Sequence, residues 1–191
     1  FLLDLRNFKG SVFTMHAIRL LLLTGVRTGE LRAATPDQFD LDAALWTVPA
    51  DNVKQLRSRV RTEGDVIPPY LVPLSRQAVE VVRALKGMTG EHCRLLLPGR
   101  NHPNTPMSEN TVNSAIKKMG YEGRLTGHGI RATLSTALNE MGYKEDWIEA
   151  QLSHAGDNKV RKTYNHAEYV EQRRVMMQEW ADFLDAAEAA D

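Results

Sequence analysis

The chain has 191 residues, of which 42% are hydrophobic and 25% are charged, a balance that is ordinary for one soluble globular domain with a substantial core. Its longest apolar run, Ile18 to Leu23, contains Arg19 and is far too short to span a bilayer. The start lacks a signal peptide and an initiator Met, which predicts a fragment of a longer cytoplasmic protein. Cys93 is the only cysteine, which excludes an internal disulfide and a cysteine-cluster metal site.

The net charge is zero, because 24 Lys and Arg residues balance 24 Asp and Glu residues. Dedicated DNA-binding domains are mostly basic, since phosphate contacts supply much of their affinity, so a neutral total counts against a DNA-binding role. A local positive face would nevertheless suffice. If the chain binds DNA, we expect other parts of the intact protein to share that binding.

The first half of the chain predicts a buried helix followed by a small sheet. Apolar side chains are dense over residues 12–23, which is typical of a helix buried on most sides. Gly25 and Gly29 then predict a turn, with a second short helix after it. Two β-rich runs, 45–49 and 70–74, predict strands joined by a polar, basic stretch, and we expect these strands to pair in antiparallel fashion.

The second half of the chain is mainly helical. Ser75 is the expected cap of a helix that ends at Gly87. Leu95 to Leu97 form a buried segment before a loop, and Ser108 is the expected cap of the next helix, which stops at Gly120. Three more helices are predicted over residues 129–141, 144–152 and 168–187. The fold class is therefore mainly α with a small antiparallel β-sheet, that is, α+β.

Two segments carry arginines in places suited to an anion. Arg27 lies between two glycines at the start of a helix, where backbone amides face an anion, and Glu30 is close enough to orient its guanidinium. His128 and Arg131 lie three residues apart on the first turn of a helix and project from one face. An arginine offers a planar fork of donors to phosphate oxygens, and a histidine donates a hydrogen bond or moves a proton.

Two later residues complete the set. His154 follows an amphipathic helix, and Tyr164 lies between two helices. Taken singly, each of the four segments also has a structural interpretation: a surface arginine, a helix-start pair, a capping histidine or a half-buried packing tyrosine. Their order along the chain is what favours a functional interpretation.

In chain order the sequence reads Gly-x-Arg-x-Gly-Glu-Leu around Arg27, a Lys near a β-rich segment, His-x-x-Arg, and Leu-x-His followed ten residues later by Tyr164. This order resembles the tyrosine recombinases, also called phage-type integrases, from about Val12 to Leu184. The chain is most similar to the integrases of prophages and genomic islands, on the stretches 128–133, 160–169 and 181–184.

The resemblance implies the catalytic-domain fold of tyrosine recombinases and type IB topoisomerases, with residues 1–191 as one domain and 168–191 as its C-terminal helix and tail. The core-binding domain that precedes this domain in the family would be absent. The implied function is site-specific DNA recombination that integrates or excises a prophage or genomic island, without a cofactor, metal or ATP. Double-stranded DNA is the implied partner, bound by a homotetramer, and the isolated domain would be a monomer.

The resemblance also assigns roles to residues. Tyr164 would attack the scissile phosphate, form a 3′-phosphotyrosyl bond and release a 5′-hydroxyl. Arg27 and Arg131 would clamp the non-bridging oxygens. His128 and His154 would add hydrogen bonds, and His128 would help to accept the proton of the tyrosine.

Lys54 matches the general acid of the family, which protonates the leaving 5′-oxygen from a strand hairpin, and Glu30 supports the first arginine. The chain departs from the family pattern after this lysine, with a longer basic stretch from Gln55 to Pro69. Within that stretch, Arg57 and Arg59 are expected to contact the DNA backbone, or to form a solvated hairpin tip.

Three rival functions are a topoisomerase-like relaxing activity without site specificity, a catalytically silent DNA-binding remnant of a degenerate prophage, and a helical interaction domain with no DNA role. The presence of every expected catalytic residue type argues against the silent remnant. The ordered motifs argue against the interaction domain, which only the zero net charge favours.

Overall fold

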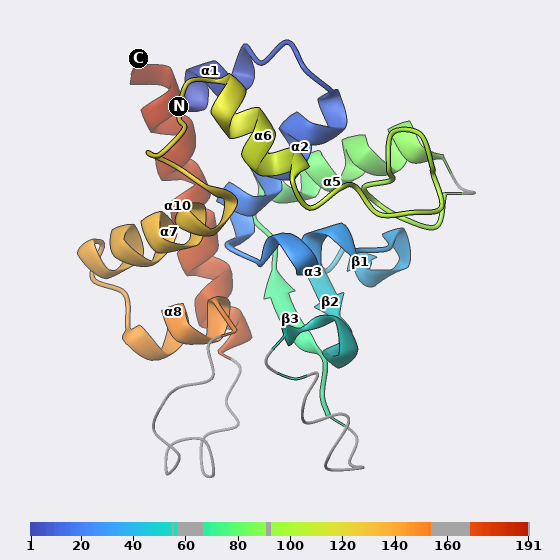
Figure 1. Ribbon diagram of the computed structural model, residues 1–191. Helices are drawn as coiled ribbons and strands as arrows, with labels where there is room; N and C mark the ends of the chain where they lie inside the picture. Colours follow the sequence, from blue (N-terminus) through green and yellow to red (C-terminus); the bar gives the residue numbers. More distant parts are fainter. Residues whose placement is uncertain (55, 57–66, 91–92, 154–168, 191) are drawn as a thin grey trace.

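The computed structural model describes residues 1–54, 56, 67–90, 93–153 and 169–190. In these ranges helices dominate, and the strands form one small antiparallel sheet (Figure 1), as the sequence predicts. The helices are α1 (Leu2–Arg6), α2 (Val12–Thr24), α3 (Thr28–Arg32), α5 (Arg76–Thr89), α6 (Thr111–Lys118), α7 (Gly127–Glu140), α8 (Glu145–Gln151) and α10 (Val170–Ala190). The strands are β1 (Phe39–Asp40), β2 (Leu45–Val48) and β3 (Tyr70–Pro73), and the 3-10 turns are η1 (Pro36–Gln38) and η2 (Ala50–Asn52). Among the described residues, no helix combines the length and the hydropathy that spanning a bilayer requires.

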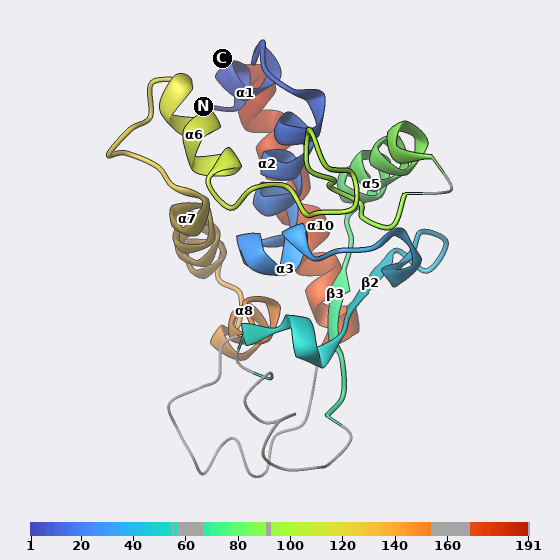
Figure 2. The same ribbon diagram turned by 45° about the vertical axis from the view of Figure 1, so that its right-hand side comes forward.

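Helix α2 lies at the centre of the domain. Its residues from Ala17 to Thr24 are buried with the exception of Arg19, because this stretch is apolar on nearly every side. It packs against α5, α6, α7 and α10. Figure 2 shows α2 and α10 in the middle of the molecule, with α6 and α7 on one side and α5 on the other. The prediction of a buried helix over residues 12–23 is therefore confirmed.

The sheet has the order β1-β2-β3, with both pairs antiparallel. Trp46 of β2 pairs with Val72 of β3 and with Phe39 of β1. Its indole is fully buried and stacks on the ring of Phe39, with centroids 4.8 Å apart. The two predicted strands and their antiparallel pairing are confirmed. Strand β1 was not predicted, because two residues are too few to show an alternating pattern.

Helix α10 packs on its own domain, running past α2 towards α1 (Figure 1). Its buried face includes Met176, Met177, Trp180, Ala181 and Leu184. The indole Nε1 of Trp180 donates to the carbonyl oxygen of Leu22 at 2.7 Å, which ties α10 to the central helix. The predicted helix over 168–187 is present as α10.

Two predicted helix boundaries were wrong. Gly87 lies inside α5, which continues to Thr89 and is followed by Gly90 with a φ of 72°. Ser108 does not cap α6. The helix begins at Thr111, and Asn110 holds the N-cap position, two residues after Ser108. Ser75 does cap α5 as predicted, since its Oγ accepts a hydrogen bond from the backbone N–H of Ala78 at 3.2 Å.

Candidate active site

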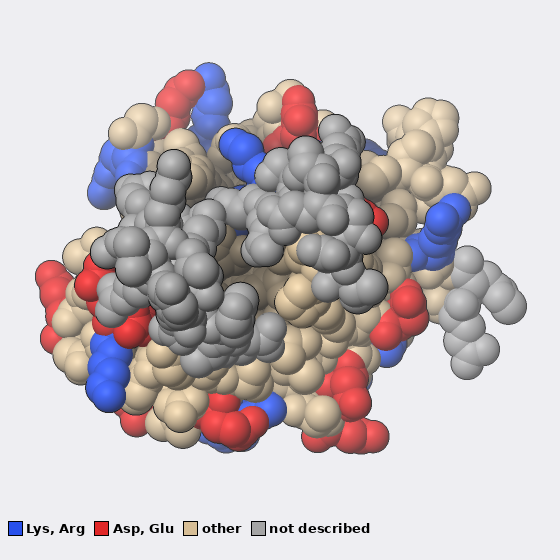
Figure 3. All heavy atoms as spheres, turned by 90° about the horizontal axis from the view of Figure 1, so that it is seen from below, with Lys and Arg blue, Asp and Glu red and all other residues tan. Residues whose placement is uncertain are grey.

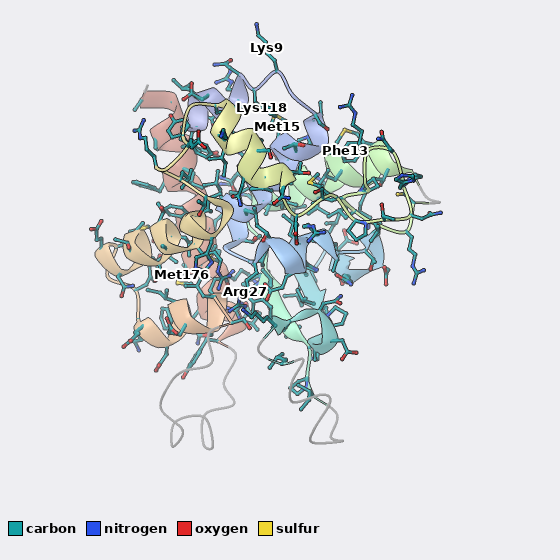
Figure 4. All side chains as sticks on the ribbon, viewed as in Figure 1. Lys9, Phe13, Met15, Arg27, Lys118 and Met176 are labelled. Atoms are coloured by element: carbon teal, nitrogen blue, oxygen red, sulfur yellow. The ribbon has the colours of Figure 1, made fainter. Side chains whose placement is uncertain are left out.

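A pocket of about 440 Å³ lies where α3, the end of η2 and the start of α7 meet. It brings together predicted site residues from three separate segments of the chain. Its lining consists of Arg27, Thr28, Gly29, Glu30, Arg32, Asn52, Lys54, Gly127, His128 and Arg131. Figure 4 shows Arg27 near the centre of the molecule.

Arg27 is placed by the end of the central helix. Gly25 ends α2 in the left-handed conformation, with a φ of 65°, and its backbone N–H donates to Leu21 at 2.9 Å. A β-carbon at this position would also lie 3.1 Å from a methyl group of Leu134, so the tight turn suits glycine. The prediction of a glycine turn is confirmed for Gly25. It was wrong for Gly29, which lies inside α3 without a left-handed φ.

Glu30 holds both the backbone and the side chain of Arg27. Its Oε2 accepts the backbone N–H of Arg27 at 2.8 Å, and its Oε1 accepts the guanidinium Nη1 at 2.9 Å. The Glu30 side chain is only 2% exposed, so the ion pair is shielded from solvent on the carboxylate side. The expected proximity of Glu30 and Arg27 is therefore observed.

Helix α7 carries His128 and Arg131 in its first turns. The Oγ1 of Thr126 caps this helix by accepting the backbone N–H of Gly129 at 2.9 Å. Both side chains line the pocket, but His128 is exposed whereas Arg131 is only 4% exposed. Burial, and then the neighbouring charge of Arg27, lowers the pKa of Arg131. A guanidinium remains charged at neutral pH in spite of this shift.

Close packing between α3 and α7 sets the width of the pocket. A β-carbon at Gly127 would lie 2.9 Å from Cγ2 of Thr28 and 3.1 Å from Cγ1 of Val112. The backbone N–H of Gly127 also donates to Oδ1 of Asn113 at 2.9 Å. A side chain at Gly127 would therefore require Thr28 of α3 or Val112 of α6 to shift.

The two pocket arginines bind consecutive carbonyl groups at the end of α8. Arg131 donates through Nη2 to Leu152 at 2.6 Å, and Arg27 donates through Nη2 to Ser153 at 3.2 Å. Arg131 also donates through Nη1 to the carbonyl oxygen of Gly25. These bonds hold two like charges beside one pocket, where an anion would relieve their repulsion.

Lys54 lines the same pocket from the segment that follows η2. It is exposed and follows η2, where the fully buried Val53 anchors the chain. Four predicted site residues lie outside the described residues, namely Arg57, Arg59, His154 and Tyr164. His154 follows Ser153 directly in the sequence.

The sequence interpretation missed Arg32 and Asn52, which also line the pocket. The guanidinium of Arg32 donates through Nε to the carbonyl oxygen of Met107. Its position five residues after Arg27, within the same glycine-containing segment, was the available signal.

Around the edge of the face seen in Figure 3, Lys and Arg alternate with Asp and Glu, so positive charge is not segregated there.

The chain matches the model of the phage integrase family over residues 4–171. It is 44% identical to the integrase of Enterobacteria phage P4 and 41% identical to the prophage integrase IntA of Escherichia coli (strain K12), in each case over 97% of this chain. It spans 43% and 42%, respectively, of the lengths of these two relatives.

Solved structures share the fold at low sequence identity. An integrase from mycobacterium phage Brujita matches with a TM-score of 0.64 at 18% identity, covering 94% of this chain and 56% of that one. The Tn1549 transposon integrase, in complex with transposon right end DNA, matches with a TM-score of 0.65 at 18% identity, covering 93% of this chain and 63% of that one. With the family model matched over most of its length, the chain belongs to the phage integrase family.

Proposed function

We propose that this chain is the catalytic domain of a site-specific DNA recombinase that cleaves and rejoins strands through a 3′-phosphotyrosyl intermediate. The observation that carries the proposal is the pocket in which Arg27 and Arg131 lie with His128 and Lys54. The family membership supports the chemistry, and the names of the phage and prophage relatives support integration or excision of such an element as the biological role.

The two arginines stabilise the transition state. Attack on a phosphodiester increases the negative charge on the non-bridging oxygens, and donors already in place lower the energy of that state without reorganising. The bonds of Arg27 to Glu30 and Ser153, and those of Arg131 to Gly25 and Leu152, provide this preorganisation. Loss of one such donor typically costs about 100- to 1000-fold in rate.

Tyr164 is the proposed nucleophile, and the other tyrosines support this choice by their positions. The hydroxyls of Tyr70, Tyr121 and Tyr143 donate to the Gln151 carbonyl, to Asp4 and to Glu179, respectively. Burial raises the pKa of Tyr70 to about 12, which disfavours its ionised, nucleophilic form. Of the remaining two, Tyr164 has the ten-residue spacing from His154, whereas Tyr169 leads into α10.

Proton transfer is assigned to the exposed side chains that line the pocket. His128 is exposed beside the buried Arg131, where it hydrogen-bonds the phosphate and helps to accept the phenol proton. Lys54 protonates the leaving 5′-oxygen, and His154 adds a further hydrogen bond. Arg57 and Arg59, in the basic stretch after Lys54, are proposed to contact the DNA backbone.

The proposed partner is double-stranded DNA, bound by four copies of the full protein. The Tn1549 integrase structures contain DNA, which supports the same partner here. We further propose that catalysis needs neither metal nor ATP. The guanidinium groups supply the positive charge, and the phosphotyrosyl bond conserves the energy of the cleaved phosphodiester for rejoining.

The test is covalent trapping on a nicked suicide duplex built from the ends of the genetic element that encodes the protein. Adduct should form in EDTA without nucleotide, and Tyr164→Phe should abolish it while DNA binding persists. Tyr169→Phe is the matched control and should retain the adduct. An adduct formed by Tyr164→Phe would refute the nucleophile assignment, and relaxation of plasmids lacking the site would favour a topoisomerase-like activity instead.

A further inference from the structure

A second polar cluster lies behind the pocket, in the core. Arg173 of α10 is 1% exposed, and Gln151 at the end of α8 is fully buried. The Nε of Arg173 donates to Oε1 of Gln151 at 3.0 Å. A buried cation of this kind costs desolvation that an apolar pair would avoid, so its presence calls for a reason other than stability.

Each partner is also fixed by a second element. Arg173 donates through Nη2 to the carbonyl oxygen of Leu71 in β3 at 2.6 Å, and its guanidinium carbon lies 5.7 Å from the centroid of the Tyr70 ring. The cluster therefore holds the first turn of α10 against the sheet.

Gln151 faces the turn that carries Arg27. Its side-chain Nε2 donates to the carbonyl oxygen of Thr24 at 2.7 Å, and its backbone carbonyl oxygen accepts a hydrogen bond from the hydroxyl of Tyr70. Two residues later Ser153 accepts a hydrogen bond from Arg27. The end of α8 is thus bonded twice to the segment between Thr24 and Arg27.

The two residues of this cluster flank the stretch between α8 and α10 in the sequence. Gln151 ends α8 and Arg173 lies in the first turn of α10, so their hydrogen bond joins the two flanks of the stretch that contains His154 and Tyr164. The hydrogen bond from Gln151 to Thr24 then connects both flanks to the turn that carries Arg27.

We propose that Gln151 and Arg173 are positioning residues, which fix the two ends of the tyrosine-bearing stretch relative to the Arg27 turn and so present Tyr164 to the bound phosphate. This inference rests on the proposed function. It requires that the pair act on the tyrosine and not on the pocket: its loss should slow attack by Tyr164 and leave DNA affinity and phosphate activation intact.

The experiment separates these two effects with two nucleophiles. In the protein with Tyr164, adduct formation on the suicide duplex is measured in single turnover. In a Tyr164→Phe background, hydrogen peroxide replaces the phenol: its anion attacks phosphorus and displaces the same 5′-hydroxyl. Cleavage by peroxide still needs the arginines, but it needs no nucleophile held in place by the protein, so its rate reports the pocket alone.

Arg173→Met and Gln151→Met remove the side-chain hydrogen bonds while keeping an unbranched side chain that can fill most of the buried space. We expect adduct formation to slow by about 100-fold, as for a misplaced reacting group, with unchanged DNA affinity and unchanged peroxide cleavage. The double variant should be no slower than either single variant, because both break one unit. Arg173→Lys and Gln151→Glu keep part of the network, and should recover part of the rate and fold where the Met variants do not.

Val82→Ala is the control for lost stability, since Val82 is fully buried in α5. Equal adduct rates in Val82→Ala and the cluster variants would overturn the inference, as would a parallel loss of peroxide cleavage. If the unmodified protein forms no adduct at all, the proposed function fails and the positioning role fails with it. Normal adduct formation by the cluster variants refutes the positioning role alone.

Discussion

Glu30 binds Arg27 at both ends, accepting its backbone N–H through one carboxylate oxygen and its guanidinium through the other. The carboxylate therefore sets the start of α3 and the direction of the arginine together. Because Glu30 is almost completely buried, water has little access to these bonds from the carboxylate side.

Glu30→Gln keeps the size of the side chain but removes its charge and one acceptor. We expect a loss of about 1–3 kcal/mol in the free energy of unfolding, because a charge-assisted bond in a shielded site is lost. Adduct formation should slow by about 10-fold or more if the misdirected Arg27 raises the activation free energy by about 1.4 kcal/mol. Urea unfolding and single-turnover trapping measure the two effects.

The control for this change is Glu171→Gln, in which an exposed glutamate paired with Arg174 loses its charge. Exposed ion pairs contribute little, so both quantities should stay at their original values. Equal effects of the two substitutions would mean that Glu30 has no special relation to Arg27.

Arg131→Lys tests the geometry of the donor fork at constant charge. A lysine cannot reproduce the paired bonds to the Gly25 and Leu152 carbonyls while also facing the pocket. Adduct formation should fall by about 100- to 1000-fold, with a smaller change in DNA affinity. Arg124→Lys, on the exposed loop before α7, should have no effect on the rate. An active Arg131→Lys enzyme would show that charge alone suffices.

Gly127→Ala tests the close approach of α7 to α3. The added methyl group would meet Thr28 and Val112, and overpacking of this kind costs about 1–3 kcal/mol. Thermal unfolding should shift to lower temperature, and adduct formation should slow because the pocket widens. Gly87→Ala is matched in chemistry but has no neighbour within 4 Å, inside helix α5, so it should raise stability by about 0.5–1 kcal/mol. The same sign for both substitutions would contradict the packing described for α7.

From the burial of Tyr70 we expect the free energy of unfolding to depend on pH in the alkaline range. Burial raises its pKa to about 12 in the folded state, whereas the unfolded value is about 10. The folded state therefore holds this proton more tightly, and stability is fully present below pH 10 and lost as the pH rises towards 12. The loss from this group is about 2–3 kcal/mol at most.

Urea unfolding at pH 9, 10.5 and 11.5 should show this decline in the unmodified chain. In Tyr70→Phe the decline should be smaller, although stability at pH 9 is lower because the bond to the Gln151 carbonyl is lost. Identical slopes for the two proteins would refute the assignment to Tyr70.

Local sequence patterns predicted much of the fold. The apolar density of α2, the β-rich runs of β2 and β3, and the cap at Ser75 are short-range signals, and each gave the observed element. Glycine was a weaker guide: Gly87 and Gly29 lie inside helices, because tertiary packing outweighs the small preference of glycine for helix ends.

The candidate site was predictable where its residues lie in one segment or follow the family order. Arg27, Lys54, His128 and Arg131 line one pocket, as their shared chemistry suggests. The Gln151–Arg173 pair was not predictable. Arg173 lies in a charged run that is typical of a solvated helix face, and its burial depends on contacts with β3 and α8 that are distant in sequence.

The burial of α2 has a consequence for how the pocket loses its shape. Backbone amides in the most buried helices exchange with solvent only when the whole domain opens, whereas peripheral elements open by local fluctuations. Arg27 follows α2 after a single turn, and Thr24 at the end of that helix receives the bond from Gln151. Arg27 is therefore attached to the part of the domain expected to exchange last, and local fluctuations at the periphery should disturb its backbone less than that of residues on outer elements.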